Sequence, residues 1–181
     1  MVEPWQLLAT REGFHNRWLH VTLDTARLPD GQVYEYTTIR RAKAGAAVAV
    51  FNPQGQLLLE QEYRLPVGQV IWQLPGGLVD VDEDAAAGMR RELHEETGLL
   101  AGELRHLGCF WNNPASSDGQ CHIFLCRDYQ AGNATRHDQA EFIAWGWYDL
   151  DWVKARVLDG GIRDRVVICA LAYLWLAGEI A

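Results

Sequence analysis

The sequence predicts an α+β fold with a small antiparallel β-hairpin at its N-terminus. Segments with strand-like character dominate the first third of the 181-residue chain. A helical pattern at 85–97 interrupts them, and two further helical patterns, at 151–158 and 164–177, close the chain. Strands with an embedded helix, followed by terminal helices, are typical of an α+β domain.

Strands are expected where β-favouring residues lie between turn-forming residues. The pair Trp18–Asp24 and Val33–Ile39 flanks the turn signal Pro29-Asp30-Gly31 and predicts the N-terminal hairpin. A second pair flanks Asn52-Pro53-Gln54-Gly55. The strands expected after the hairpin are Ala44–Phe51, Gln56–Tyr63, Val70–Leu74, Leu104–Trp111, Cys121–Tyr129 and Phe142–Tyr148.

The helix expected at Ala85–Thr97 carries a start signal and a stop signal. Asp84 can cap its N-terminus because a carboxylate accepts hydrogen bonds from the unpaired N–H groups of the first turn. Gly98 can end it because glycine adopts a left-handed conformation without strain. Its apolar stripe consists of Ala86, Met89 and Leu93.

Composition limits the classes of partner. The net charge of −8 argues against an extended nucleic-acid groove. The apolar run Val166–Ala177 is too short to span a bilayer, so no membrane partner is expected. The first residues lack the pattern of a signal peptide, and the four cysteines form no CxxC pair. We therefore expect a cytoplasmic protein without a disulfide framework or a structural zinc site.

Three acidic residues crowd one face of the expected helix. Glu96 lies four residues after Glu92, and Glu95 lies three residues after it, so their side chains are neighbours. Like charges at this spacing repel one another, and a hard divalent cation with oxygen ligands would relieve the repulsion. The pattern predicts a Mg²⁺ site on the helix; a solvated acidic face is the alternative.

The same segment resembles the Nudix box at all of its fixed positions. The matching residues are Gly77, Glu83 and the run Arg91-Glu92-Leu93-His94-Glu95-Glu96-Thr97-Gly98-Leu99. The match is specific because so many positions agree within one short segment. The resemblance implies an α/β/α sandwich with a mixed sheet. It also implies an enzyme that uses a divalent metal, Mg²⁺ or Mn²⁺, to hydrolyse a nucleoside diphosphate linked to another group.

The flanking segments resemble the ADP-ribose pyrophosphatase and nucleoside diphosphate sugar hydrolase branch of that family. The resemblance is carried by Trp18–Arg41, Gln61-Glu62-Tyr63-Arg64, Pro75-Gly76-Gly77, Pro114 and Gln139–Ile143. It implies that residues 1–42 form a β-hairpin region for dimerisation and substrate contacts. Residues 43–181 would then form the hydrolase domain, and a homodimer is expected.

The resemblance also implies roles for individual residues around the metal. The implied ligands are the backbone carbonyl of Gly76 and the carboxylates of Glu92, Glu95 and Glu96. The branch usually has alanine at the position of Gly76, but a carbonyl ligand does not depend on the side chain. Arg91 can hold the neighbouring acids by bidentate hydrogen bonds. Glu83 either binds a metal or a ligand, or favours the helix N-terminus through its charge.

The general base remains open between two positions. Several members of this branch use a glutamate in a loop, and by position in the family this corresponds here to Glu141. A glutamate of the box, Glu95 or Glu96, is the rival. A base must reach the attacking water and have a suitable pKa, and the sequence alone shows neither property.

Substrate contacts are expected outside the box. Trp18 and Tyr36 correspond to hairpin residues that clamp a base between subunits in this branch, although simple hairpin packing is the alternative. Arg41 and Arg64 are candidate ligands for the diphosphate or the terminal ribose, because the guanidinium group offers a planar fork to phosphate. The polar loop Asn112–Gln120, which contains Pro114, is a candidate substrate loop or an ordinary surface turn.

The function expected from these residues is hydrolysis of ADP-ribose or a related nucleoside diphosphate sugar to a nucleoside monophosphate and a sugar phosphate. A GDP-mannose-type hydrolase is an alternative within the class, and a non-catalytic ADP-ribose sensor is an alternative from another class. Sensors typically lose acids of the box, which this chain retains. The N-terminal segment argues against a nucleoside triphosphate hydrolase, and a NADH-cleaving member would usually carry zinc-binding cysteines.

Overall fold

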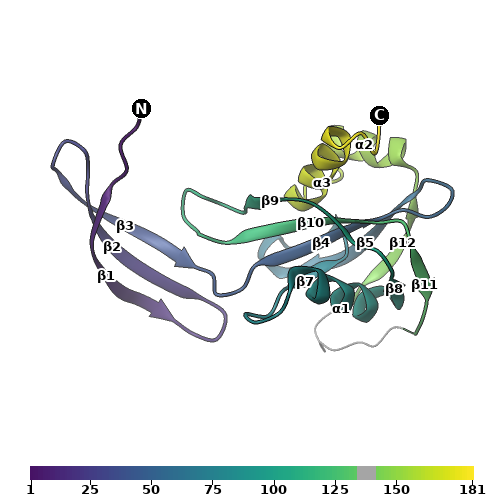
Figure 1. Cartoon of the computed structure of the whole chain (residues 1–181), viewed down its shortest axis with the longest axis horizontal. Helices are drawn as coiled ribbons and strands as arrows, with labels where there is room; N and C mark the ends of the chain where they lie inside the picture. The colour runs from purple at the N-terminus through teal and green to yellow at the C-terminus, as the bar shows by residue number, and fades with distance from the viewer. Residues whose placement is uncertain (134–141) are drawn as a thin grey trace. The chain divides into compact units, whose positions relative to one another are not determined.

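A computed structural model describes residues 1–133 and 142–181 of the chain. These residues form two units, which Figure 1 colours by residue number. The first unit contains residues 1–44 and 110–120, and the second contains residues 45–109 and 121–181. The candidate Glu141 lies outside the described residues.

The first unit is built on a three-stranded antiparallel sheet in the order β1-β2-β3. Its strands are β1 (Gln6–His15), β2 (His20–Arg27) and β3 (Val33–Arg40). The predicted hairpin corresponds to β2 and β3, and Gly31 in its turn has a left-handed φ of 88°. The prediction lacked β1, which pairs with β2 along its length and contains two register shifts.

The second unit contains two larger sheets and one small one. The first has the order β7-β4-β10-β9, in which β4 and β10 are parallel and β4 and β7 are antiparallel. The second has the order β12-β5-β6 and is antiparallel. A two-stranded ladder joins β11 and β8. The strands are β4 (Gly45–Val50), β5 (Leu57–Arg64), β6 (Gln69–Gln73), β7 (Gly76–Leu78), β8 (Leu99–Ala101), β9 (Arg105–Trp111), β10 (Gln120–Cys126), β11 (Tyr129–Ala131) and β12 (Ala144–Tyr148).

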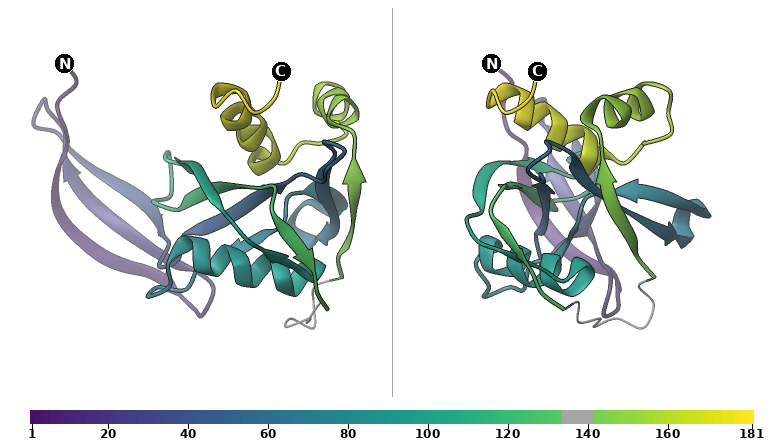
Figure 2. Two further views of the ribbon diagram at one scale, coloured as in Figure 1. Left: turned by 45° about the vertical axis from the view of Figure 1, so that its right-hand side comes forward. Right: turned by 90° about the vertical axis from the view of Figure 1, so that its right-hand side faces the viewer.

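Helices cover both faces of the β4–β10 sheet. Helix α1 (Ala85–Thr97) lies on one face, and α2 (Leu150–Leu158) and α3 (Arg165–Leu176) lie on the other (Figures 1 and 2). A short 3₁₀ turn, η1 (Leu65–Val67), links β5 to β6. This arrangement confirms the predicted α/β/α sandwich with a mixed sheet. Among the described helices, none is both long and apolar enough to cross a membrane.

The core of the second unit lies between α1 and the β4–β10 sheet. Met89 and Leu93 from α1 pack there with Val48, Val50 and Phe124 from the strands, and all five are buried. Burial of each such side chain contributes about 1.5–3 kcal/mol to folding. The opposite face of α1 is thereby left to its acidic residues, so the packing of the apolar stripe orients the candidate site.

The two ends of α1 are capped as the sequence predicts. The Asp84 carboxylate accepts hydrogen bonds from the N–H groups of Ala86 and Ala87 at 3.1 and 3.2 Å. At the other end Gly98 has a φ of 77°, and its N–H donates to the carbonyl of His94. The helix therefore begins and ends at fixed residues, and the spacing of its acids from the preceding turn is fixed as well.

Removal of the N-terminal cap gives a test of this anchoring. We expect Asp84→Ala to lower the free energy of unfolding by about 0.5–2 kcal/mol, because two N–H groups lose their acceptor. Urea denaturation measures the change. The exposed Asp151→Asn substitution, in the first turn of α2, is the control, because Asp149 and not Asp151 stands at the N-cap there. Equal stabilities of the two variants would contradict the capping role.

Candidate active site

The candidate site lies where β7 leads through a turn into α1. Strand β7 itself carries Gly76 and Gly77, which lie beside the acidic residues of the helix. The carboxylate of Glu96 accepts a hydrogen bond from the N–H of Gly76, with 2.9 Å between the two atoms. This contact ties the C-terminal half of α1 to the strand whose carbonyl is a predicted metal ligand.

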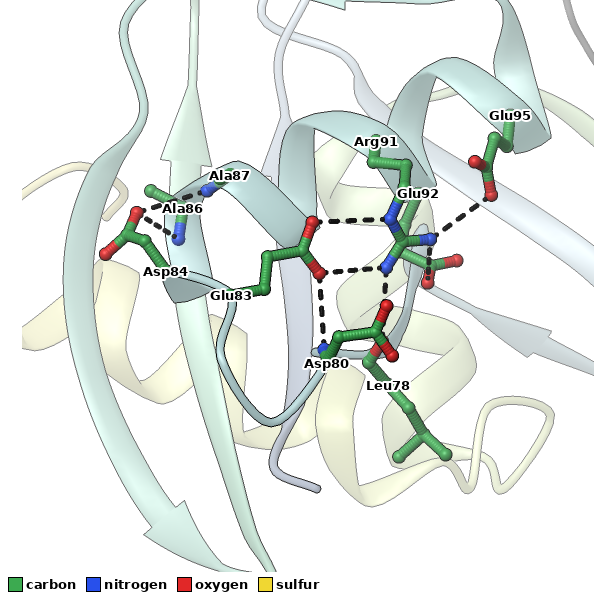
Figure 3. Close-up of polar contacts among 9 residues, drawn as sticks. All are labelled: Leu78, Asp80, Glu83, Asp84, Ala86, Ala87, Arg91, Glu92 and Glu95. Carbon is green, nitrogen blue, oxygen red and sulfur yellow. Dashed lines mark hydrogen bonds and ion pairs between the residues drawn. The ribbon is translucent and has the colours of Figure 1, made fainter. Parts of the chain in front are cut away.

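Arg91 stands at the centre of the acidic cluster (Figure 3). Its Nη1 donates to Glu92 at 2.8 Å and to Glu95 at 3.3 Å. Its Nε and Nη2 donate to the two carboxylate oxygens of Glu83 at 3.4 and 3.1 Å. Nη2 also donates to the backbone carbonyl of Leu78 at 3.3 Å. One guanidinium group thus connects Glu83, in the turn before the helix, to Glu92 and Glu95 of α1.

Charges around Arg91 change the pKa values of its neighbours. The hydrogen bond from Arg91 holds the pKa of Glu83 below its usual value. Burial raises the pKa of Glu92, and although Arg91 opposes this shift, the charges of Glu95 and Glu83 add to it. The hydrogen bond with Glu83 contributes most to a raised pKa of Arg91. A further cation beside Glu92 would stabilise its charged form.

The Glu92 carboxylate lies against the backbone of Gly77. A Cβ atom at residue 77 would stand 2.4 Å from Cδ of Glu92 and 2.5 Å from its Oε2. A Cβ atom at Gly76 would stand 2.3 Å from the carbonyl oxygen of Ala46. At Gly76 the obstructing atoms are backbone atoms of strand β4, so glycine is required there, whereas at Gly77 they belong to the flexible end of the Glu92 side chain.

The donor chemistry of the cluster suits a hard divalent cation. Glu92, Glu95 and Glu96 offer carboxylate oxygens and Gly76 offers a backbone carbonyl, and oxygen ligands are those that such cations prefer. The carboxylate that lies against Gly77, that of Glu92, is one whose charged form is disfavoured by burial. In the described part of the chain, no three acidic, histidine or cysteine side chains converge as a ready set of metal ligands. Two of the acids instead face Arg91.

Arg64 lies at the end of β5 and is held by two neighbours. Its Nη2 is 2.8 Å from Oε2 of Glu62. Its Nε and Nη2 both donate to the amide oxygen of Gln73, at 3.1 and 3.0 Å. Gln73 in turn donates to Glu62 at 2.8 Å. Glu62 and Gln73 are buried while the Arg64 side chain is half exposed, so the guanidinium group is held by buried partners and is also accessible to solvent.

The predicted clamp residues lie at different places in the first unit. Trp18 is in the β1–β2 turn, its side chain is exposed, and the guanidinium group of Arg17 lies over its ring at 4.6 Å. Tyr36 lies on β3, opposite Asp24 of β2. The centroid of the Tyr36 ring lies 6.0 Å from the ring centroid of Trp5 and 6.3 Å from that of Tyr34. Within this unit the structure does not pair the rings of Trp18 and Tyr36.

The polar loop that contains Pro114 lies beside β3 in the same unit. The hydroxyl group of Tyr36 donates to the carbonyl of Ala115. The N–H of Ile39 donates to the carbonyl of Ser116 at 2.7 Å, and the N–H of Arg41 donates to the carboxylate of Asp118 at 2.8 Å. The structure therefore brings the loop that contains Pro114 into contact with two of the predicted substrate residues, Tyr36 and Arg41.

Comparison with known proteins identifies the family. The model of the NUDIX domain family matches residues 41–171. The chain belongs to the Nudix family. This makes it a member of a family of pyrophosphohydrolases, which generally use divalent metal ions. A second family, described as the nucleoside diphosphate sugar hydrolase N-terminal domain, matches residues 5–39 of this Nudix protein.

Individual relatives cover almost the whole Nudix chain. It is 27% identical to the methanol dehydrogenase activator of Bacillus methanolicus, over 93% of this chain and 91% of that protein. It is 25% identical to the ADP-ribose pyrophosphatase of Bacillus subtilis, with the same coverage of both proteins. A solved structure of an ADP compounds hydrolase superposes with a TM-score of 0.88 at 19% identity, covering 99% of this chain and 97% of that one. This similarity confirms the predicted fold.

Several residues that contact the candidate residues within either unit were not predicted from sequence. Glu62 and Gln73 anchor Arg64, and the period of two along β5 could have placed Glu62 on the same face as Arg64. Trp5 lies before the first strand predicted, so its contact with Tyr36 had no sequence signal. Arg40 and Asp118 form an ion pair between residues far apart in the chain, which no local pattern indicates.

Proposed function

We propose that this Nudix protein hydrolyses the diphosphate bond of ADP-ribose or a related nucleoside diphosphate sugar. The products would be a nucleoside monophosphate and a sugar phosphate. The observation that carries the proposal is the acidic cluster around Arg91, in a chain whose N-terminal segment matches the nucleoside diphosphate sugar hydrolase model. The similarity to an ADP-ribose pyrophosphatase supports ADP-ribose as the first substrate to test.

A substrate panel tests the reaction and its specificity together. The purified chain is incubated with Mg²⁺ and ADP-ribose, GDP-mannose, ADP-glucose or UDP-glucose, and released monophosphate is quantified by chromatography. We expect the highest kcat/KM for ADP-ribose. Faster turnover of GDP-mannose would support the GDP-mannose-type alternative. Binding of ADP-ribose without monophosphate release from any substrate would contradict the proposal and favour a sensor.

We propose that Glu92, Glu95, Glu96 and the carbonyl of Gly76 hold Mg²⁺, and that Mn²⁺ can replace it. When bound, the ion supplies positive charge to the phosphate oxygens and lowers the pKa of water. Arg91 holds Glu92 and Glu95 in place for this purpose through its Nη1. Removal of metal with EDTA should abolish turnover, and added Mg²⁺ or Mn²⁺ should restore it. Full activity after metal removal would contradict this assignment.

The attacking water also needs a group that accepts its proton. We propose one carboxylate for this role, from Glu141 or from the pair Glu95 and Glu96. The pH dependence of kcat distinguishes them, because loss of the base removes the acidic limb of the profile. If Glu141→Gln retains that limb and Glu95→Gln loses it, the base belongs to α1. The opposite result assigns the base to Glu141.

We propose that Trp18, Tyr36, Arg41, Arg64 and Pro114 contribute to substrate binding. Stacking of an aromatic ring on a base contributes about 1–3 kcal/mol, and both arginines can offer a planar fork to phosphate. The exposed ring of Trp18 and the anchored guanidinium group of Arg64 support this assignment. Alanine at each position should raise KM more than it lowers kcat.

The anchoring of Arg64 gives a specific prediction. We expect Glu62→Gln to raise KM for ADP-ribose about tenfold with little change in kcat, because a charged hydrogen bond that orients Arg64 is weakened. Steady-state kinetics measures both constants. Asp151→Asn removes an exposed acid and should change neither. An unchanged KM for Glu62→Gln would show that Arg64 does not contact substrate in this orientation.

We propose that residues 1–42 mediate a homodimer and residues 43–181 form the hydrolase domain. The first unit exposes Trp5, Leu7, Phe14, Val33 and Tyr34, and apolar groups of this number on one small sheet are typical of an interaction surface. Light scattering after size-exclusion chromatography gives the mass in solution. A monomer at micromolar concentration would contradict the dimer.

A further inference from the structure

We infer that Asp118 is a positioning residue that, together with Arg40, holds the loop Asn112–Gly119 on strand β3 in its substrate-binding conformation. We call these residues the docked loop. The inference rests on the proposed function, in which Arg41 and Pro114 bind substrate. All the contacts that carry it lie within the first unit of the chain.

The docked loop contains hydrogen bonds of its own, in addition to its contacts with β3. The carbonyl of Asn113 accepts hydrogen bonds from the N–H groups of Ser116 and Ser117 at 3.0 and 2.8 Å. The amide nitrogen of the Asn113 side chain donates to the hydroxyl of Ser116 at 2.8 Å. The N–H of Gly119 donates to the hydroxyl of Ser117. The loop therefore has a defined shape that can be attached at a few points.

Strand β3 supplies two of those points, at Tyr36 and Ile39. Tyr36 binds the carbonyl of Ala115, and Ile39 binds the carbonyl of Ser116. These two contacts use loop carbonyls and would tolerate many loop sequences. Asp118 is the one charged residue of the docked loop, and its side chain takes part in the attachment. Its position at the end of the loop makes it the residue that selects one conformation.

The Asp118 carboxylate contacts two consecutive residues of the chain. Its Oδ1 accepts the N–H of Arg41 at 2.8 Å, and its Oδ2 lies 3.5 Å from Nη1 of Arg40. Residue 119 follows as glycine, where a Cβ atom would stand 2.9 Å from Cγ of Arg41. The loop end thus contacts the backbone of Arg41, and the Arg41 side chain leaves no room for a larger residue at position 119. We infer that the conformation of the loop end sets the direction of the Arg41 side chain, directly after the end of β3.

Arg40 is held so firmly that it can serve only as an anchor. Its Nη2 donates to Oδ2 of Asp24 at 2.6 Å, and its Nε donates to the hydroxyl of Thr22 at 3.2 Å. With Nη1 facing Asp118, every nitrogen of the guanidinium group has a partner. We therefore assign no substrate contact to Arg40, in contrast to its neighbour Arg41.

Asp24 fixes this anchor from inside the sheet. It is only 6% exposed and accepts hydrogen bonds from Thr10 and Thr38 at 2.8 and 2.7 Å. Burial raises the pKa of Asp24, but the hydrogen bonds from Thr38 and Thr10 and the charge of Arg40 together hold it below its usual value. A buried carboxylate that stays charged requires its partners, so Arg40 is confined to one place.

The network could instead serve only the stability of the sheet. The two roles predict different kinetics. If the network only stabilises the sheet, breaking it lowers the melting temperature. The molecules that remain folded then bind substrate as well as the unmodified chain does. A positioning network would change KM at temperatures where the protein is fully folded, with kcat retained, because the chemistry lies with other residues.

Asp118→Asn tests the inference without disturbing the buried acid. Asparagine keeps the size of the side chain and can still accept the N–H of Arg41, but its amide group cannot pair with Arg40. We expect faster hydrogen exchange at the backbone amides of 112–119, by about tenfold or more, because local opening becomes easier. We also expect KM for ADP-ribose to rise about tenfold while kcat stays within about twofold.

Glu35→Gln is the matched control, since Glu35 pairs with Arg11 at 3.1 Å on the same sheet and does not contact the loop. It should change neither the exchange of 112–119 nor KM. Unchanged loop exchange in Asp118→Asn would overturn the inference. Faster exchange with an unchanged KM would also overturn it, and would leave the network a stabilising role only.

Failure of the proposed function is distinguishable from failure of the inference. If the unmodified chain hydrolyses no member of the substrate panel, the proposed function fails. Two measurements that need no turnover then test the inference. They are the hydrogen exchange of the backbone amides of 112–119 and the affinity for AMP measured by calorimetry. Asp118→Asn should weaken AMP binding about tenfold relative to Glu35→Gln, and equal affinities would overturn it.

Discussion

Replacement of Glu96 by glutamine is expected to lower kcat for ADP-ribose roughly 10³-fold, which corresponds to about 4 kcal/mol of transition-state stabilisation. The substitution removes one negative charge from the proposed metal ligands. Glutamine keeps an oxygen that can accept the N–H of Gly76, so the contact between α1 and β7 is retained. Steady-state kinetics with Mg²⁺ measures kcat, and calorimetry measures the affinity for ADP-ribose, which should change little.

Glu103→Gln is the control for this experiment. Glu103 is an exposed acid of the same unit and lies outside the box segment 77–99. Its kcat should match that of the unmodified chain. If Glu96→Gln hydrolyses ADP-ribose at the original rate, Glu96 is not a metal ligand. If its melting temperature falls steeply, the glutamate acts on the fold and the ligand assignment is also contradicted.

The second large effect is expected for Gly77→Ala, with a fall in kcat of roughly 10²-fold and a change in the free energy of unfolding below about 1 kcal/mol. The new Cβ atom would stand 2.4 Å from Cδ of Glu92. Because the obstructed atoms form the end of a flexible side chain, Glu92 can turn aside at little cost to the fold. The carboxylate then leaves both Arg91 and the proposed metal position.

Comparison with a second glycine separates this effect from a general loss of stability. Gly161→Ala places a Cβ atom 3.1 Å from a carboxylate oxygen of Asp159, which is also the end of a flexible side chain. Its kcat and urea midpoint should both be close to those of the unmodified chain. If Gly77→Ala retained full kcat, the close approach of Glu92 to the backbone would have no part in catalysis.

The elements with strong local signals were predictable from sequence. Helix α1 occupies the residues expected, since its N-cap, its C-cap and its apolar stripe all indicate the same boundaries. The paired strands β2 and β3 were found from their turn, although β2 begins and ends a few residues later than expected. Local hydrogen bonds and periodicity determine such elements, and both can be read from neighbouring residues.

Strand β1 and the short strands were not predictable in the same way. The β1 ladder shifts register between Leu7 and Ala9 and between Glu12 and Phe14, so the alternation of its side chains is interrupted. Strands β7, β8 and β11 are each only three residues long and depend on their partners. Their positions follow from the packed sheet and not from the residues themselves.

The residues of the candidate site also fall into a group with local sequence signals and a group without them. The acids of α1 and Arg91 belong to one segment, so their proximity follows from the helix. The anchors of the arginines come from other strands or from the loop, as with Gln73 beside Arg64 and Asp118 beside Arg40. Their partners were unpredictable because each contact depends on the pairing of distant strands.

The first unit contains two separate stretches of the chain, and this has a consequence for dissection of the protein. A cut between residues 44 and 45 would free the N-terminal sheet without residues 110–120, which belong to the same unit. The remaining fragment would keep those residues but lose Tyr36 and Ile39, which hold the docked loop. The two units are therefore expected to be inseparable as working parts. Exchange of specificity between relatives would require both stretches to be transplanted together.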